Sequence, residues 1–173
     1  MKKEMLQTPA IIVYMDALEH NLQKYHDAAK AAGKQIWPMI KTHKSLEMID
    51  LQEKAGATGY LCGTLDEAEA LCKKGIKNIM YAYPVASEVS IKRVIELAKK
   101  TNFIIRLDNL DGAALIEKYA AEAGVTIQYT IIINAGLNRF GLKPDKVLEF
   151  AEAMKQFRHL KFVGVSSHPG HVY

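Results

Sequence analysis

Short apolar runs alternate along this sequence with longer stretches that carry helix start and stop signals. From Gln35 onward the alternation repeats roughly every 20–35 residues, which is typical of βα units in a parallel sheet. The runs are almost continuously apolar, as expected for strands that are covered on both faces. Strands are predicted at AIIVYM (10–15), QIWPMI (35–40), TGYLCG (58–63), NIMYAY (78–83), NFIIRL (102–107), YTIIIN (129–134) and KFVGVSS (161–167).

Capping signals define the helices between these runs. Asp16 and Glu19 stand at capping-box spacing, and Thr64 and Glu67 repeat the pattern. Both residue pairs therefore predict the first turn of a helix. The expected helices span 16–33, 64–75, 87–100, 111–124 and 144–157, and the first two end at glycines.

Two architectures fit repeated βα units, a (β/α)8 barrel of the TIM type and a doubly wound open sheet. The sequence contains neither the GxGxxG of a dinucleotide-binding sheet nor a GxxxxGK[ST] phosphate loop, so the barrel is favoured. A complete barrel needs about 250 residues, whereas this chain has 173. We expect one domain over residues 1–173, an α/β partial barrel of about six βα units. Further units and a C-terminal domain are expected outside this sequence.

Composition excludes several classes of function. The chain is 49% hydrophobic and 24% charged with a formal net charge of +4, which is ordinary for a globular domain. Lys and Arg are scattered, so no nucleic-acid partner is expected. No apolar segment approaches the length of a membrane span, so no membrane partner is expected either. Cys62 and Cys72 lack CxxC spacing and resemble buried thiols in a reducing compartment, which predicts a cytoplasmic protein.

The segment WPMIKTHKSLEM ends an apolar run in charged residues. Side chains alternate along a strand, so Lys41 is expected on the barrel side with Met39, while Ile40 faces the helices. Lys41 then stands at the carboxyl end of a strand, where such barrels place their chemistry. A partly buried lysine loses stabilisation of its charge and becomes an amine nucleophile. On position alone, a loop lysine with its stem on the core is the commoner alternative. Lys44 is expected in solvent.

Two later segments add polar residues at strand ends. In NAGLNRFG, Arg139 carries a guanidinium that can hold an oxyanion in a bidentate way. A surface ion pair with a helix carboxylate is an equal alternative for Arg139. In GVSSHPGHVY, alternation puts His168 at the rim on the barrel face. His168 and His171 alone do not make a zinc site, because zinc takes three or four ligands.

The order of several motifs resembles one protein family. TPAIIVYMDALEHN, WPMIKTHKSLEM, ATGYLCGTLDEAEAL, NIMYAYPV, NAGLNRFG and GVSSHPGHVY follow one another along the chain. In these segments the chain resembles the N-terminal part of the D-threonine aldolase and D-serine dehydratase family, relatives of alanine racemase. Lys41 begins a match to the family's K-T-H-K. The resemblance implies an alanine-racemase-type barrel of fold type III, with pyridoxal 5'-phosphate held on Lys41 as a Schiff base.

The same resemblance assigns further site residues. Arg139 would hold the cofactor's phenolate oxygen or a substrate carboxylate. His168 would stack on the pyridine ring, and Tyr173 would orient the cofactor or a substrate group. The resemblance thus implies one catalytic residue, Lys41, and no metal ligand in this chain.

Some positions depart from the family pattern. Trp37 and Met39 stand where the family has an arginine and a histidine, which leaves the exact reaction open. Alanine racemases carry a lysine and an aspartate where this chain has Ile132 and Asn134. The second departure argues against a true alanine racemase.

Arg106 and Asp108 lie on one face of the predicted strand FIIRLD. The simpler interpretation is a charge pair buried inside the barrel. The alternative is that either side chain faces the cofactor ring.

The resemblance implies a pyridoxal-phosphate-dependent lyase that acts on a D-amino acid with a β-hydroxyl group, by aldol cleavage or dehydration. The family commonly binds a divalent metal through its C-terminal domain, and a homo-oligomer is expected. This chain alone is expected to be inactive. The alternatives are an amino-acid racemase, a non-catalytic module that binds pyridoxal phosphate, and an inactive folding unit.

Overall fold

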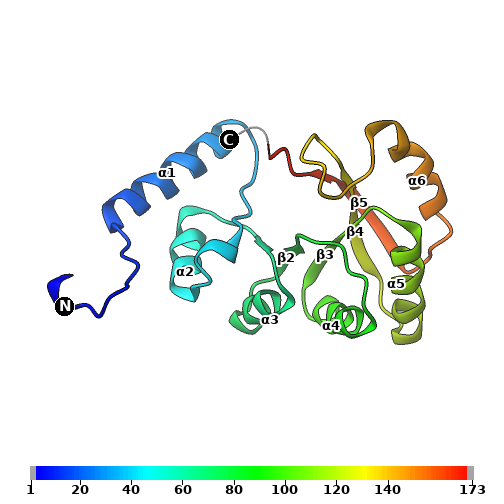
Figure 1. Cartoon of the computed structure of the whole chain (residues 1–173), viewed down its shortest axis with the longest axis horizontal. Coiled ribbons are helices and arrows are strands. Elements are labelled where there is room, and N and C mark those ends of the chain that lie inside the picture. The colour runs from blue at the N-terminus through cyan, green and yellow to red at the C-terminus, as the bar shows by residue number, and fades with distance from the viewer. Residues whose placement is uncertain (1–2, 171–173) are drawn as a thin grey trace.

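The computed structural model describes residues 3–170, and its elements alternate between helix and strand as the sequence predicts (Figure 1). The helices are α1 (Met15–Ala31), α2 (Leu46–Ala55), α3 (Leu65–Lys74), α4 (Glu88–Ala98), α5 (Leu110–Ala123) and α6 (Val147–Met154). The strands are β1 (Tyr60–Cys62), β2 (Asn78–Tyr81), β3 (Asn102–Leu107), β4 (Ile127–Ile133) and β5 (Leu160–Ser167). Three short 3-10 turns are η1 (Lys3–Met5), η2 (Ile40–Thr42) and η3 (Pro144–Lys146).

Parallel strands form one sheet in the order β1-β2-β3-β4-β5. Each strand pairs with the next strand in the chain after an intervening helix, so the sheet is wound in one direction, as in a barrel. Helices α3 to α6 lie along one side of the sheet and follow its curve (Figure 1). The structure therefore confirms the predicted partial barrel.

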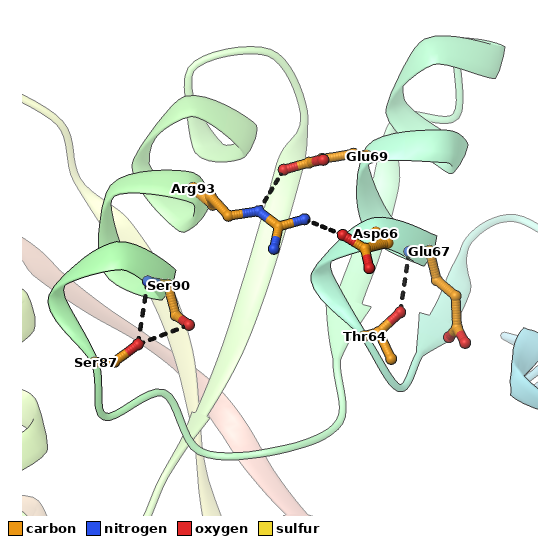
Figure 2. Close-up of polar contacts among 7 residues, drawn as sticks. All are labelled: Thr64, Asp66, Glu67, Glu69, Ser87, Ser90 and Arg93. Atoms are coloured by element: carbon orange, nitrogen blue, oxygen red, sulfur yellow. Dashed lines mark hydrogen bonds and ion pairs between the residues drawn. The ribbon is translucent and has the colours of Figure 1, made fainter.

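Side-chain caps fix the starts of the helices that cover the sheet. The Thr64 hydroxyl accepts a hydrogen bond from the Glu67 amide (3.1 Å), and the Ser87 hydroxyl accepts one from the Ser90 amide (3.3 Å; Figure 2). The cap predicted at Thr64 is thus confirmed. The Glu67 carboxylate accepts from the Gly63 amide (2.7 Å), one residue before the position that a capping box predicts.

An arginine on α4 joins that helix to α3. Arg93 donates from Nε to Glu69 Oε1 (2.7 Å) and from Nη2 to Asp66, both on α3 (Figure 2). All three side chains are partly exposed, so each pair contributes at most about 1 kcal/mol. The contact fixes the spacing of two helices on the outer side of the sheet.

The strand predicted at 10–15 is not formed. Residues 10–14 have no regular structure, and Met15 begins α1. Ile11 is 98% exposed, so this apolar run has no neighbouring strand in the described structure to pair with its backbone. The cap predicted at Asp16 is also wrong, because Tyr14 occupies the N-cap without a side-chain hydrogen bond. Asp16 instead lies in the first turn, where the helix dipole favours a carboxylate.

The strand predicted at 35–40 is reduced to one bridge. Met39 pairs in parallel with Leu61, and the Pro38 carbonyl accepts the Leu61 amide (2.9 Å). Pro38 has no N–H group with which to extend the ladder. Trp37 packs on Gly59, where an added methyl group would lie 2.5 Å from the indole ring. The first barrel strand therefore runs beside β1 but joins the sheet at a single residue.

The sheet has a helix-facing side and an inner side with different contents. Phe103, Ile105 and Leu107 of β3 belong to the apolar core shared with the helices. Ile104 and Arg106 alternate with them and lie on the inner side. Complete burial of a side chain such as that of Ile105 contributes about 1.5–3 kcal/mol. The core on the outer side thus holds the strands in place, and polar residues collect on the inner side.

The two cysteines differ in burial. Cys62 is buried in the core, and desolvation raises the pKa of its thiol to about 12. Cys72 was expected to be buried as well but is partly exposed. Neither cysteine is in a disulfide.

The two predicted caps can be separated by substitution. Thr64→Ala should lower the free energy of unfolding by about 0.5–2 kcal/mol, because the Glu67 amide loses its acceptor. Asp16→Ala should change it by less than about 0.5 kcal/mol, because no amide depends on this carboxylate. Urea unfolding followed by circular dichroism measures both changes. Equal losses in the two variants would contradict this assignment of the caps.

Candidate functional site

Lys41 lies directly after the bridge that joins the first barrel strand to β1. It is in the turn η2, where Ile40 is buried in the helix-side core, as predicted, and Lys41 is exposed. The expected partial burial of Lys41 is therefore not seen. A methyl group added at Gly63 would come within 3.4 Å of the Lys41 Cβ. The missing side chain at Gly63 thus leaves room for the lysine at the carboxyl end of β1.

Glu67 is a buried carboxylate beside this turn. It is 7% exposed, and its Oε1 lies 3.1 Å from the Nζ of Lys44 in an ion pair without hydrogen-bond geometry. Lys44 was expected in solvent, and its side chain is 60% exposed, but its amine has this partner. Lys41 makes no ion pair with any residue from 3 to 170. The two lysines of the motif therefore differ, because only Lys44 is paired with a carboxylate.

His43 follows this turn and binds the backbone just after it. Its Nδ1 accepts the Ser45 amide (3.1 Å), which places the ring proton of the neutral form on Nε2. Burial lowers the pKa of His43, so the neutral form is favoured at neutral pH. The Gln52 amide nitrogen lies 3.5 Å from Nε2, and the buried Gln52 Oε1 has no partner. Rotation of this amide by half a turn would give Nε2–H an acceptor.

A buried guanidinium crosses the inner side of the sheet. Arg106 on β3 is 5% exposed, donates from Nε to Ser166 Oγ (2.9 Å) and from Nη1 to the Ala82 carbonyl (3.1 Å). Ser166 Oγ also lies 2.9 Å from Thr130 Oγ1. Nη2 of Arg106 is buried and has no hydrogen-bond partner in the described structure. Burial lowers the pKa of this guanidinium, but an arginine remains charged.

Asp108 holds a rim loop and does not pair with Arg106. Its Oδ2 accepts the Gly141 amide (2.8 Å), and no ion pair joins it to Arg106 within the described residues. The predicted buried charge pair is therefore wrong, because the loop backbone uses this carboxylate. Asn134 organises the same loop, since its Oδ1 accepts the amides two and four residues further on (both 3.1 Å). Gly141 has a φ of +104°, and an added methyl group would lie 2.8 Å from the Asn134 nitrogen, so glycine is required there.

The rim loop carries an arginine that contacts two aromatic rings. The guanidinium carbon of Arg139 lies 4.5 Å from the Phe140 ring centroid and 5.4 Å from the Tyr83 ring centroid. The two rings meet edge to face at 5.8 Å. Arg139 is exposed and forms no ion pair within residues 3–170, so the alternative of a surface salt bridge is not seen. These ring contacts restrain the guanidinium group and leave its N–H groups without a carboxylate partner among residues 3–170.

His168 follows β5 on the face that also carries Ser166. Partial burial, and then the positive charges of Arg139, Lys41 and Arg106, lower the pKa of His168. Such an influence falls off with distance, so these three cations lie near His168. The neutral imidazole is therefore favoured at neutral pH.

Three of the four predicted site residues thus meet at one edge of the sheet: Lys41, Arg139 and His168. Tyr173 lies outside the described residues, as does His171. Tyr83 was not predicted as a site residue, although it ends the run NIMYAY at the same edge. An aromatic residue at the carboxyl end of a barrel strand is the signal that could have identified it.

Residues 3–170 contain neither a metal-binding cluster nor a membrane-spanning helix. No group of three or more His, Cys, Asp or Glu side chains there could hold a metal ion. No helix in that range is long and apolar enough to cross a membrane. The described chemistry of the edge is therefore that of an unpaired amine, a neutral imidazole and two guanidinium groups.

Comparison with known proteins places this geometry in a family. The sequence pattern of the family described as "Alanine racemase, N-terminal domain" matches residues 13–172. A 3-hydroxy-D-aspartate aldolase from Paracoccus denitrificans is 31% identical over 173 residues, covering 98% of this chain and 45% of the relative. The chain thus spans less than half the length of this curated relative.

Solved structures agree with the sequence comparison. D-threonine aldolase from Filomicrobium marinum superposes with a TM-score of 0.87 at 31% identity, covering 92% of this chain and 43% of that one. D-threo-3-hydroxyaspartate dehydratase from Delftia sp. HT23 gives 0.89 at 26% identity, covering 96% and 44%. The resemblance to the D-threonine aldolase and D-serine dehydratase group is confirmed, and the chain belongs to the family of alanine racemase N-terminal domains.

Proposed function

We propose that this chain supplies the lysine-bearing side of a pyridoxal-phosphate site in a lyase that acts on β-hydroxy D-amino acids. The observation that carries the proposal is that Lys41, which forms no ion pair within residues 3–170, shares the carboxyl edge of the barrel with Arg139 and His168. Relatives named as aldolases and dehydratases support the reaction class. Their greater length supports the view that turnover belongs to the intact protein.

The residues at this edge fit pyridoxal phosphate by their chemistry. An amine without a carboxylate partner suits an aldehyde, and Lys41 is such an amine. A guanidinium with available N–H groups suits a phenolate oxygen, and Arg139 offers these. A neutral imidazole suits an aromatic ring, which is the state favoured at His168. The phosphate of a barrel ligand is typically held by loops after strands seven and eight, whereas the sheet described here has five strands.

Each side chain has a separate task in this proposal. When bound, the cofactor supplies an electron sink for the bonds at the substrate's α carbon. Lys41 binds the cofactor and accepts or returns a proton at its amine. Glu67 keeps Lys44 occupied, so that one amine of the motif is left to react. Arg139 orients an oxyanion, and the Asp108 contact to the Gly141 amide holds its loop in place.

Racemisation is the second candidate reaction. The residues on the inner side of β4 and just after it do not favour this reaction. Ile132 is 1% exposed and apolar, and it stands where alanine racemases carry a lysine. Asn134 is used by the rim loop through its hydrogen bonds to two amides. These positions therefore offer no amine or carboxylate, and a lyase fits them better than a racemase.

Several features of the intact protein remain part of the proposal. We expect a small amino-acid substrate, a homo-oligomer and a cytoplasmic location. No candidate group of metal ligands is found within residues 3–170. A divalent metal that polarises the β-hydroxyl would therefore take its ligands from outside this range. Tyr173 is proposed to orient the cofactor or the substrate.

Lys41 should be the attachment residue. Borohydride reduction of the intact protein loaded with pyridoxal phosphate should leave a pyridoxyl group on the Lys41 peptide, as read by mass spectrometry. Lys41→Arg should abolish the adduct, whereas Lys44→Arg should retain it, because Lys44 is paired with Glu67. An adduct on Lys44, or none at either position, would sink the assignment.

Arg139 should control the titration of His168. Since the folded pKa of His168 lies below the ordinary 6.5, its neutral ring stabilises the fold above pH 6.5, and this contribution is lost as pH falls through the folded pKa. Arg139→Gln should raise the pKa of His168 toward 6.5, because a nearby positive charge is removed. Titration of the His168 ring protons by NMR measures the shift.

The matched control for this titration is Arg158→Gln. Arg158 precedes β5, at the end of that strand opposite to His168, and its side chain is exposed. This variant should leave the pKa of His168 unchanged. Equal shifts in both variants would mean that net charge, and not the rim cluster, sets the pKa.

A further inference from the structure

We propose that Arg106 is a carboxylate-binding residue on the inner side of the barrel, and that it takes a carboxylate of the amino-acid substrate. This rests on the proposed function and adds a binding residue that the sequence motifs do not include. The feature that carries it is Nη2 of Arg106, which is buried and has no acceptor in the described structure.

A guanidinium in this position is unfavourable for the fold alone. Arg106 is 5% exposed, and no carboxylate of residues 3–170 pairs with it. Its acceptors are one hydroxyl, on Ser166, and the Ala82 carbonyl, which are both neutral. Burying a charge without a counter-charge is costly, and a buried donor without an acceptor adds to that cost. An anionic ligand would supply both missing partners.

The surroundings of Arg106 make the missing partner an anion. The charges of Lys41, Arg139 and Arg106 all influence His168, and Arg139 also influences Arg106, so the three cations lie near one another. The Asp108 carboxylate favours the charged form of Arg106 but forms no ion pair with it, and its Oδ2 accepts the Gly141 amide. Three cations beside a single carboxylate leave a net positive charge, which favours a negatively charged occupant.

One aromatic ring covers the guanidinium. The Phe140 ring centroid lies 5.8 Å from the Arg106 guanidinium carbon, and Nη2 is shielded from solvent. Phe140 belongs to the rim loop between β4 and η3, which has no regular secondary structure at this residue. In this proposal a carboxylate reaches Nη2 after a movement of the Phe140 side chain. Nη1 and Nε keep their present acceptors during this movement.

A carboxylate fits this position better than the phosphate of the cofactor. Phosphates in such barrels are typically held by loops after strands seven and eight, whereas Arg106 lies within β3. The two sources of an oxyanion are separated by using malonate and inorganic phosphate as probes.

The test is an NMR titration of the cofactor-free 173-residue protein with malonate. The Arg106 Nε–H signal should shift on addition of malonate and to a smaller extent on addition of phosphate. Arg106→Met should weaken malonate binding, followed through the His168 ring signals, by about tenfold or more. Arg158→Met, which removes the same charge from an exposed position, should leave the affinity within about twofold.

Two further variants keep the test decisive. Ser166→Ala removes one acceptor of Arg106 but leaves its charge, so malonate affinity should be retained. If Arg106→Met does not fold, Arg106→Gln replaces it, because a glutamine can still donate to Ser166 and carries no charge; the same loss of affinity is expected. Unchanged malonate affinity in either folded Arg106 variant would overturn the proposal.

Phosphate binding and the Lys41 adduct distinguish this proposal from the proposed function. Phosphate binding that is tighter than malonate binding and is lost with Arg106 would overturn the choice of a carboxylate. Loss of malonate binding with Arg106, together with no pyridoxyl adduct on Lys41, would support this binding residue and reject the proposed lyase. An adduct on Lys41 with malonate affinity independent of Arg106 would do the reverse.

Discussion

Parallel pairing of strands in chain order is the constraint on which the rest of this structure depends. Because β1 to β5 all run in one direction, their carboxyl ends meet at one edge, and the residues that follow each strand become neighbours. Lys41 beside β1, Tyr83 after β2, Arg139 after β4 and His168 after β5 are brought together in this way. The helix-side core holds the strands in register, so the edge is built on rigid elements.

The positive charges of Lys41, Arg106 and Arg139 at this edge are not paired with carboxylates of the described residues. Arg106 is buried without a carboxylate, and Arg139 stacks on rings with its N–H groups unused by carboxylates of the described residues. Two carboxylates near the edge have other partners, since Glu67 contacts Lys44 and Asp108 accepts a loop amide. Unbalanced buried charge lowers stability, and a bound anion would restore the balance. The edge therefore combines a buried guanidinium, that of Arg106, which has no ion pair within residues 3–170, with the exposed amine of Lys41.

Much of this could be predicted from local sequence signals. The cap at Thr64 and the burial of Ile40 follow from spacing, and the structure agrees, whereas Lys41 lies exposed in a 3-10 turn. The prediction of a full strand at 35–40 is wrong. It rests on apolar composition, and Pro38 has no N–H group for the ladder. The pairing of Arg106 with Asp108 was also misjudged, because strand alternation shows a shared face but not which amide competes for the carboxylate. Contacts between distant segments, such as Arg106 with Ser166, depend on the barrel itself.

The central claim is that the carboxyl edge of this barrel holds pyridoxal phosphate between Lys41 and His168. A crystal structure of the intact protein grown with the cofactor tests it most directly. Our account predicts continuous electron density from Lys41 Nζ to the cofactor, the His168 imidazole against the ring and the Arg139 guanidinium beside its phenolate oxygen. Density for the cofactor at another lysine, or at the helix-facing side of the sheet, would contradict the account.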